Sequence, residues 1–175
     1  MPTQNMTAAS LGNVVIDVGA LYVDYGETNE RMIGATKGGV TFNVEQNVRM
    51  IEADNARGPL KGGRRVTSET ARLTASIMEM TADNISMALF GMTSGQRTLS
   101  APQDSEYMTN VALVAGINGS NTDGLVITLK NVLVDGNFEL SMEDENEGSV
   151  EVQFTAHFDP ATLDQSPYTI QRTTI

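Results

Sequence analysis

GVTFNVEQNV (Gly39–Val48) alternates apolar and polar residues, and RVTSETARLTASIMEM (Arg65–Met80) repeats that pattern after one intervening segment. In the first stretch, Val40, Phe42 and Val44 fall on one side of an extended chain and polar residues on the other. A period of two is typical of a strand with one buried face. We therefore expect two long neighbouring strands here. The second strand turns Leu73, Ala75 and Ile77 inward and Arg72, Thr74 and Ser76 outward.

Similar signals continue on both sides of this pair. Further strands are predicted at 15–26, 110–117, 124–135, 137–143 and 149–158, where β-branched residues are frequent and turn residues follow. The last of these turns Val150, Val152, Phe154, Ala156 and Phe158 inward and Glu151, Gln153, Thr155 and His157 outward. One helix is predicted over 81–91, with Thr81 as its N-cap, Asp83 in its first turn and Gly91 at its end. Residues 93–106 contain many turn formers and are predicted to form a surface loop.

Many strands with a single helix predict a mainly β fold, a β-sandwich or barrel with one flanking α-helix and a long protruding loop. The 175 residues suffice for one domain. We expect an N-terminal arm over 1–16, the β domain over 17–160 with its long loop at 51–65, and an extended C-terminal tail over 161–175.

The composition restricts the function. The chain has 22 Asp and Glu residues against 11 Lys and Arg residues, a net charge of -11. This charge argues against a protein that binds nucleic acid generally and against one that binds an anionic membrane surface. No apolar run is long enough to span a membrane, and the N-terminus does not resemble a signal peptide. We expect the protein to be made in a cytoplasm.

Catalytic and metal-binding patterns are weak. The chain has no Cys, which excludes disulfides, thiolate metal sites and cysteine nucleophiles. Its one histidine, His157, is expected on the polar face of a strand, where a solvated or hydrogen-bonded role outweighs catalysis. The acidic stretch EDENEGSVE (Glu143–Glu151) lacks the order of ligands that an EF-hand requires, and an acidic hairpin turn outweighs a weak Ca²⁺ site. We expect no enzyme activity, no cofactor and no metal.

ADNARGPLKGGRRVTSE (Ala53–Glu69) concentrates positive charge in an acidic chain. It is not a phosphate-binding loop, because that motif needs Gly-Lys-Ser/Thr followed by a helix, whereas here Gly62 follows Lys61 and a strand comes next. A protruding connection between two strands remains, and its positive charge favours an anionic partner. The candidate contact residues of this loop are Asp54, Arg57, Pro59, Lys61, Gly62, Gly63, Arg64 and Arg65.

The same chain carries a candidate acidic contact patch at Glu139, Glu143, Asp144, Glu145 and Glu147. A basic loop and an acidic patch that cannot easily meet within one subunit favour head-to-tail association of copies, which closes into rings or extends into filaments. An ordinary solvated loop is an equal alternative on these observations.

Several stretches together resemble the tail tube (major tail) proteins of tailed bacteriophages. The first is GALYVDYGETNERMIGATKGGVTFNVEQNVRMIEADNARGPLKGGRRV (Gly19–Val66), with its IGATKGGV entry into a strand and its loop ending in Lys-Gly and basic residues. The second is TARLTASIMEMTADNISMAL (Thr70–Leu89), a strand leading into a single helix, and the third is VEVQFTAHFDP (Val150–Pro160). The likeness covers about residues 18–92 and 124–170 and consists of patterns, not of a catalytic signature.

This resemblance implies hexameric rings that stack into a hollow tube, the long loop reaching the adjacent ring and the N-terminal arm and C-terminal tail contacting other subunits. The tube would conduct DNA from capsid to host cell without binding it specifically, and an acidic channel would repel phosphates. Implied partners are other copies, a tape measure protein, a tail terminator and tail tip or baseplate proteins, in a virion tail assembled in the host cytoplasm. The candidate channel-facing residues are Thr41, Asn43, Glu45, Thr67 and Glu69.

Two other functions stay open. One is a monomeric β-sandwich module that binds a ligand through the 52–65 loop. The other is the tube subunit of a contractile bacteriocin or of a secretion-type machine, since related folds occur there.

Overall fold

The computed structural model describes residues 14–15, 19–52, 54, 57–89, 92–93, 96–97, 101–117, 123–136, 138–143 and 146–174. Its strands are β1 (Ala20–Val23), β2 (Arg31–Met32), β3 (Thr36–Met50), β4 (Arg64–Ile77), β5 (Met92–Thr93), β6 (Gln96–Arg97), β7 (Met108–Gly116), β8 (Asp123–Val134), β9 (Glu139–Glu143), β10 (Asn146–Ala156) and β11 (Tyr168–Thr174). The helices are α2 (Ala82–Ala88) and the 3-10 turn η1 (Asp104–Glu106).

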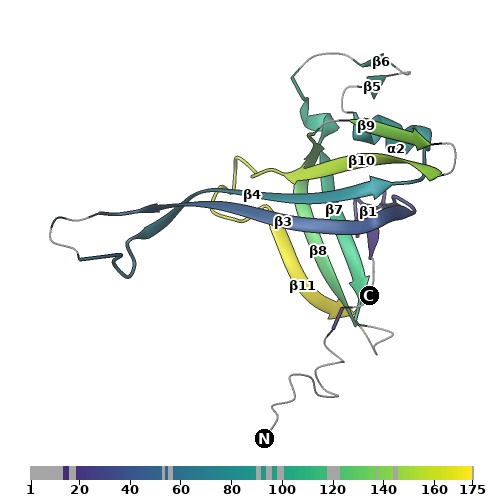
Figure 1. The fold of residues 1–175 in the computed structure, drawn as a ribbon. Coiled ribbons are helices and arrows are strands. Elements are labelled where there is room, and N and C mark those ends of the chain that lie inside the picture. The colour runs from purple at the N-terminus through teal and green to yellow at the C-terminus, as the bar shows by residue number, and fades with distance from the viewer. Residues whose placement is uncertain are drawn as a thin grey trace, which may run out of the picture.

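Within the described residues, nine strands form one antiparallel sheet in the order β2-β1-β7-β8-β10-β4-β3. β9 pairs with β10, and β11 pairs with β8 beside this path. Figure 1 shows β3, β4 and β10 crossing in front of the steeply inclined β7, β8 and β11. The predicted mainly β fold with one flanking helix is confirmed, and its two layers are parts of a single bent sheet.

The sheet divides at β8. One edge of β8 pairs with β11 from Asp123 to Leu129 and then with β10 from Val132 to Val134. At the change of partner, Asn131 has a positive φ of 49°, a left-handed conformation that asparagine tolerates better than most residues. The backbone of Lys130 bonds to both sides, because its N–H donates to Pro167 O at 2.8 Å and its carbonyl accepts from His157 N at 3.2 Å.

The core lies between the two layers. Phe154 of β10, Leu73 of β4 and Leu129 of β8 are fully buried, and the rings of Phe42 and Tyr168 join the layers with centroids 5.7 Å apart. The following buried residues complete the cluster: Leu21, Val23, Ile33, Ala71, Ala75, Ile77, Ala88, Val111, Leu113, Ile127, Val132, Val134, Val150, Val152 and Ala156.

Helix α2 begins where the sequence predicts, since the Thr81 side chain accepts a hydrogen bond from Asn84 N at 3.2 Å. It ends at Ala88, earlier than the predicted 91, with Leu89 as an extended C-cap. Asn84 is buried, which the sequence reading did not anticipate. Its amide donates to Ile33 O and to Glu79 O, both at 2.9 Å, and its Oδ1 accepts from Arg31 Nη1 at 2.7 Å.

Three local predictions need correction. The strand predicted at 15–26 is shorter, because β1 covers 20–23 and Val15 makes only an isolated bridge to Ile117. Thr155, predicted to face outward, is buried, because β8 and β4 flank β10 at that position. The predicted loop over 93–106 contains the short β5–β6 pair and η1.

The C-terminal segment pairs with the sheet, because β11 lies along β8 from Tyr168 to Thr174. In the described part of the chain, no helix has the length and apolar character needed to cross a membrane.

Candidate functional site

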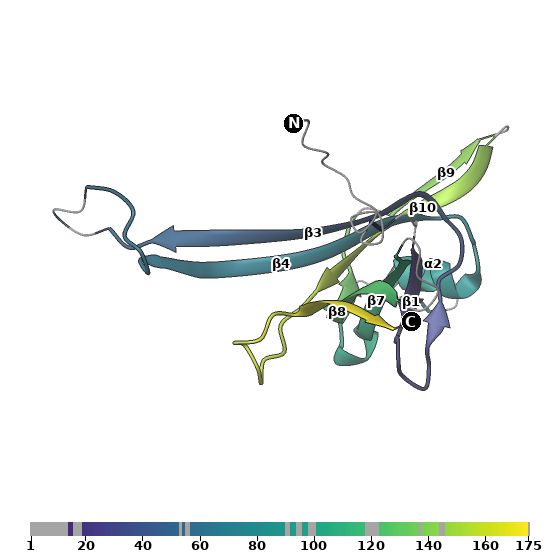
Figure 2. The same cartoon turned by 90° about the horizontal axis from the view of Figure 1, so that it is seen from below.

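The β3–β4 hairpin projects far outside the body of the protein, and both views show it as an arm (Figures 1 and 2). β3 and β4 pair along their length, from Thr36 opposite Ile77 to Met50 opposite Arg64. From Glu45 to the tip, every residue of β3 is exposed, and so are Arg64 to Ser68 of β4. The part of the hairpin beyond the body, residues 45–68 as far as they are described, is called the distal hairpin below.

Two glycines lie near the start of β3, at the end of the hairpin that is within the body. Gly38 and Gly39 have φ values of 79° and 87°, and the pairing shifts between Lys37 and Val40, where β3 carries two extra residues. Glycine adopts positive φ without the steric cost that other residues meet. The KGGV sequence therefore forms a bulge that bends the start of β3.

The long loop predicted at 51–65 is shorter than expected. β4 begins at Arg64, so Arg64 and Arg65 belong to the strand. The described part of the turn is closed by Ile51 N donating to Gly63 O at 2.7 Å and Gly63 N donating to Leu60 O at 3.0 Å. Arg57, Pro59, Lys61 and Gly62 lie exposed in the turn, as does Asp54.

One face of the distal hairpin is apolar. The side of β3 that packs Val40, Phe42 and Val44 against the core carries Gln46 next, opposite Glu69, and then Val48 and Met50. Val66 lies opposite Val48 and is 51% exposed, against 48% for Val48. Ile51 and Leu60 of the turn are also exposed. Beyond the polar pair Gln46 and Glu69, this side thus exposes an apolar cluster to solvent, with Arg64 opposite Met50, and an exposed apolar cluster marks interaction sites.

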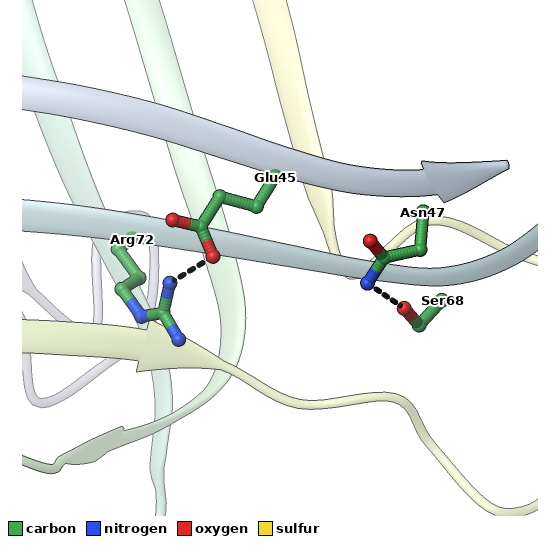
Figure 3. A network of polar contacts seen from close by, with 4 residues as sticks. All are labelled: Glu45, Asn47, Ser68 and Arg72. Atoms are coloured by element: carbon green, nitrogen blue, oxygen red, sulfur yellow. Dashed lines mark hydrogen bonds and ion pairs between the residues drawn. The ribbon is translucent and has the colours of Figure 1, made fainter.

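The opposite face is polar. Arg72 Nη1 donates to Glu45 Oε2 at 2.8 Å, and Asn47 Nδ2 donates to Ser68 Oγ at 2.8 Å, as Figure 3 shows. Farther out, Arg49 and Arg65 lie directly opposite each other. No acidic side chain within the described residues pairs with either arginine.

A β-bulge separates the two halves of β4. Ser68 pairs with Asn47 and Val66 with Val48, so Thr67 is an extra residue without a partner in the ladder. Its Oγ1 donates to Asn47 O at 3.1 Å. Bulges increase twist and re-aim the strand beyond them. This one keeps Val66 on the apolar face and Arg65 on the polar face.

A polar contact closes the core where the arm leaves the body. Gln46 Nε2 donates to Glu69 Oε2 across the hairpin, on the core side of the sheet. Burial raises the pKa of Tyr168, and the charge of Glu69 raises it further. The neutral phenol is therefore favoured in the folded protein.

No protein-family model matches the chain, and no curated protein matches its sequence. Among solved structures, a subunit from the tail of an empty GTA particle, refined with C6 symmetry, superposes with a TM-score of 0.51 at 9% identity. That superposition covers 89% of this chain and 96% of the other. The chain shares the fold of this GTA tail subunit. A chain from the virion of a native gene transfer agent particle gives a TM-score of 0.49 at 12% identity. The superposition covers 89% of this chain and 95% of the other. An Hcp protein gives a TM-score of 0.32 at 15% identity, and the superposition covers 75% of this chain and 69% of the Hcp chain.

In this fold, the candidate channel residues do not share one face. Thr41, Asn43 and Glu45 are exposed on the polar face. Glu69 lies on the core side, opposite Gln46, and Thr67 occupies the bulge. The bulge could not be read from the alternation, but the inward side of Glu69 could, because Glu69 lies at a spacing of two from Ala71, Leu73 and Ala75.

The candidate acidic patch lies on the β9–β10 hairpin, at the end of the sheet far from the distal hairpin (Figure 1). Glu139 is opposite Glu151, and Glu143 ends β9. Glu147 Oε2 lies 3.4 Å from Lys37 Nζ. Its own backbone N–H and Lys37 lower the pKa of Glu147. Asp144, Glu145 and the N-terminal residues 1–13 lie outside the described residues.

His157 lies beside the division at β8. Its Nδ1 is 3.0 Å from Asn131 O, and its ring meets Tyr107 edge-on with centroids 5.2 Å apart. Both contacts fix the ring against the fold. In the described part of the chain, no group of three or more His, Cys, Asp or Glu side chains is placed to hold a metal ion.

The sequence reading missed the apolar surface of the distal hairpin and the arginine pair. The signal was present, since the spacing of two that links Val40, Phe42 and Val44 reaches Val48 and Met50.

Proposed function

We propose that this protein is the structural subunit of a phage tail tube. Copies form hexameric rings, the rings stack into a hollow tube, and the tube conducts DNA from the capsid to the host cell. The similar chain from the GTA tail belongs to an assembly of C6 symmetry, which supports the six-fold ring.

The observation that carries this proposal is the distal hairpin. It leaves the body with an exposed apolar face at Val48, Met50 and Val66. Exposing such an apolar surface to water is unfavourable for a monomer, whereas a neighbouring copy can bury it and gain the free energy of removing it from water. A projecting arm of this kind suits a contact from one ring to the next.

An open sheet edge supports the same conclusion. β3 has 15 residues and, in the described part of the chain, pairs only with β4. A long exposed edge strand is a template for pairing with another chain unless it is covered. Between copies in a ring, the edge of β3 can be covered by a strand of the neighbour.

The polar face of β3 is the proposed channel surface, with Thr41, Asn43 and Glu45 on it. On this part of the face Arg72 is paired with Glu45, and short polar and acidic side chains give DNA phosphates few free cations to bind, so the genome can slide. The outer part of the same face carries Arg49 and Arg65 and lies outside the proposed channel surface. The net charge of -11 acts in the same direction. A tape measure protein inside the tube, a terminator and a tip or baseplate at its ends are the proposed partners in the virion.

Negative-stain electron microscopy of the purified full chain, over a range of concentrations and on the parent particle, tests the proposal. We expect rings or tubes with a central channel and six subunits per ring. A protein that is monomeric in the assembled particle would overturn it. A monomeric binding module instead predicts a ligand-induced change near the hairpin turn without self-association.

A further inference from the structure

Two pairs of like charge face each other across neighbouring strands on the polar face of the β9-β10-β4-β3 part of the sheet. Arg49 of β3 is opposite Arg65 of β4, and Glu139 of β9 is opposite Glu151 of β10. All four side chains belong to exposed residues. Like charges placed directly opposite each other destabilise a sheet. Neither pair forms an ion pair within the described residues.

Both pairs lie on the same face. Val150 and Val152 of β10 are buried in the core, so Glu151 between them points away from it, together with its partner Glu139. On β3 the core side carries Phe42 and Val44, and the alternation places Arg49 on the other side with Asn47.

The two pairs lie at opposite ends of the molecule. The distal hairpin and the β9–β10 hairpin extend in opposite directions in both views (Figures 1 and 2). The arginines of one copy therefore cannot reach the glutamates of the same copy. A second copy can bring the two pairs together.

We propose that the Arg49–Arg65 pair of one copy docks on the Glu139–Glu151 pair of another copy, in a head-to-tail contact. The spacing matches, because both pairs are direct cross-strand neighbours and so have Cβ atoms about 4.5–5.5 Å apart. Two guanidinium groups can thus meet two carboxylates at once. Arginine suits this contact because its planar group binds carboxylates through two hydrogen bonds. The contact is heterologous, so it repeats from copy to copy.

This inference rests on the proposed tube and names one contact within it. Reversing one pair, by Arg49→Glu with Arg65→Glu or by Glu139→Arg with Glu151→Arg, should raise the protein concentration needed for assembly about tenfold or more. Combining all four substitutions should restore assembly, because the charges are exchanged and still complementary. A control matched to the acidic pair, Glu27→Arg with Asp135→Arg, changes the net charge by the same amount as Glu139→Arg with Glu151→Arg at two other exposed acids. Sedimentation and electron microscopy measure the result.

Cross-linking gives a second measurement that does not depend on tube formation. The chain has no cysteine, so Arg49→Cys with Glu139→Cys introduces the only thiols. We expect ladders of disulfide-linked copies under mild oxidation, and none from Arg49→Cys with Glu27→Cys.

Normal assembly of either reversed pair, failure of the fourfold variant to recover, equal loss in the charge control or absence of the ladder would each overturn this contact. Tubes from the unmodified chain would still stand as support for the proposed function. If the unmodified chain forms no ring or tube in the assembled particle, the proposed function fails, and the ladder still decides whether the two pairs meet.

Discussion

Asn84 is the polar side chain that ties helix α2 to the sheet. It is 4% exposed and bonds to Arg31, to the Ile33 carbonyl and to the Glu79 carbonyl. These three groups come from different segments. One amide therefore fixes the position of the helix relative to the start of β3 and the end of β4.

Replacing Asn84 with Ala should lower the free energy of unfolding by about 2–4 kcal/mol. The substitution leaves two carbonyls and part of the Arg31 guanidinium without their partner. Urea denaturation followed by circular dichroism measures the change. Ser86→Ala, at an exposed position of the same helix, is the control and should stay within about 0.5 kcal/mol of the unmodified protein. Equal stability of the two variants would contradict the anchoring role of Asn84.

Tyr168 makes the fold sensitive to alkali. Burial, and then the charge of Glu69, raise its pKa above the ordinary value of 10.0. As pH rises past 10, the unfolded chain loses the phenol proton before the folded one does, so stability falls with pH. Tyr168→Phe keeps the ring contact with Phe42 and removes the titrating group. We expect the variant to lose less stability between pH 9 and pH 11, measured by denaturation at each pH. Glu69→Gln should reduce the fall only in part, since burial is the larger cause. An unchanged alkaline profile in Tyr168→Phe would disprove this account.

The direction of the distal hairpin depends on Thr67, the extra residue that forms the bulge in β4. The bulge re-aims the outer part of β4 while the apolar and polar faces keep their residues. Because residues 64–68 are exposed, the bulge contributes direction and not core packing. If the bulge only sets the direction of the arm, its loss should affect assembly and leave the stability of the body unchanged.

Deleting Thr67 should therefore leave the body stable and impair assembly. Regular pairing of Ser68 with Asn47 and of Val66 with Val48 can then continue without the bulge. We expect a change of less than about 1 kcal/mol in the free energy of unfolding and a clear loss of tubes in electron micrographs. Thr67→Ser retains the extra residue and its hydroxyl, and should assemble normally. Normal tubes from the deletion variant would show that the bulge does not aim the arm.

The sequence predicted the strands and the helix start well because local patterns determine them. The alternation in Val40, Phe42 and Val44 identifies β3, and Thr81 identifies the start of α2. The division of β8 at Asn131 escaped prediction, because changing the pairing partner along one edge depends on distant strands. Glu69 is a different case, because the alternation through Leu73 and Ala75 already places it inward, and its assignment to the channel surface was wrong. Its contact with Gln46 depends on the register of β3 and β4, which the sequence does not reveal.

At the scale of the whole molecule, assembly and stability use different residues. The core closes between the two layers without Val48, Met50 and Val66, which remain exposed on the arm. An exposed apolar face of this kind has no use in a protein that stays monomeric, whereas in a polymer a neighbouring copy can bury it. In the proposed tube, the residues that bind the next copy therefore lie outside the core that stabilises the fold.

Val48→Asp with Val66→Asp tests this separation directly. Burying apolar surface drives association, and two buried carboxylates would oppose it strongly. We expect a monomer with the native circular dichroism spectrum, a free energy of unfolding within about 1 kcal/mol of the unmodified protein, and no tubes. The control Met32→Asp places a charge at a similarly exposed site, at 54%, on β2 and away from the arm. Sedimentation velocity distinguishes monomer from rings. Tubes formed by the double variant at the usual concentration would mean that the apolar face of the arm is not buried between copies.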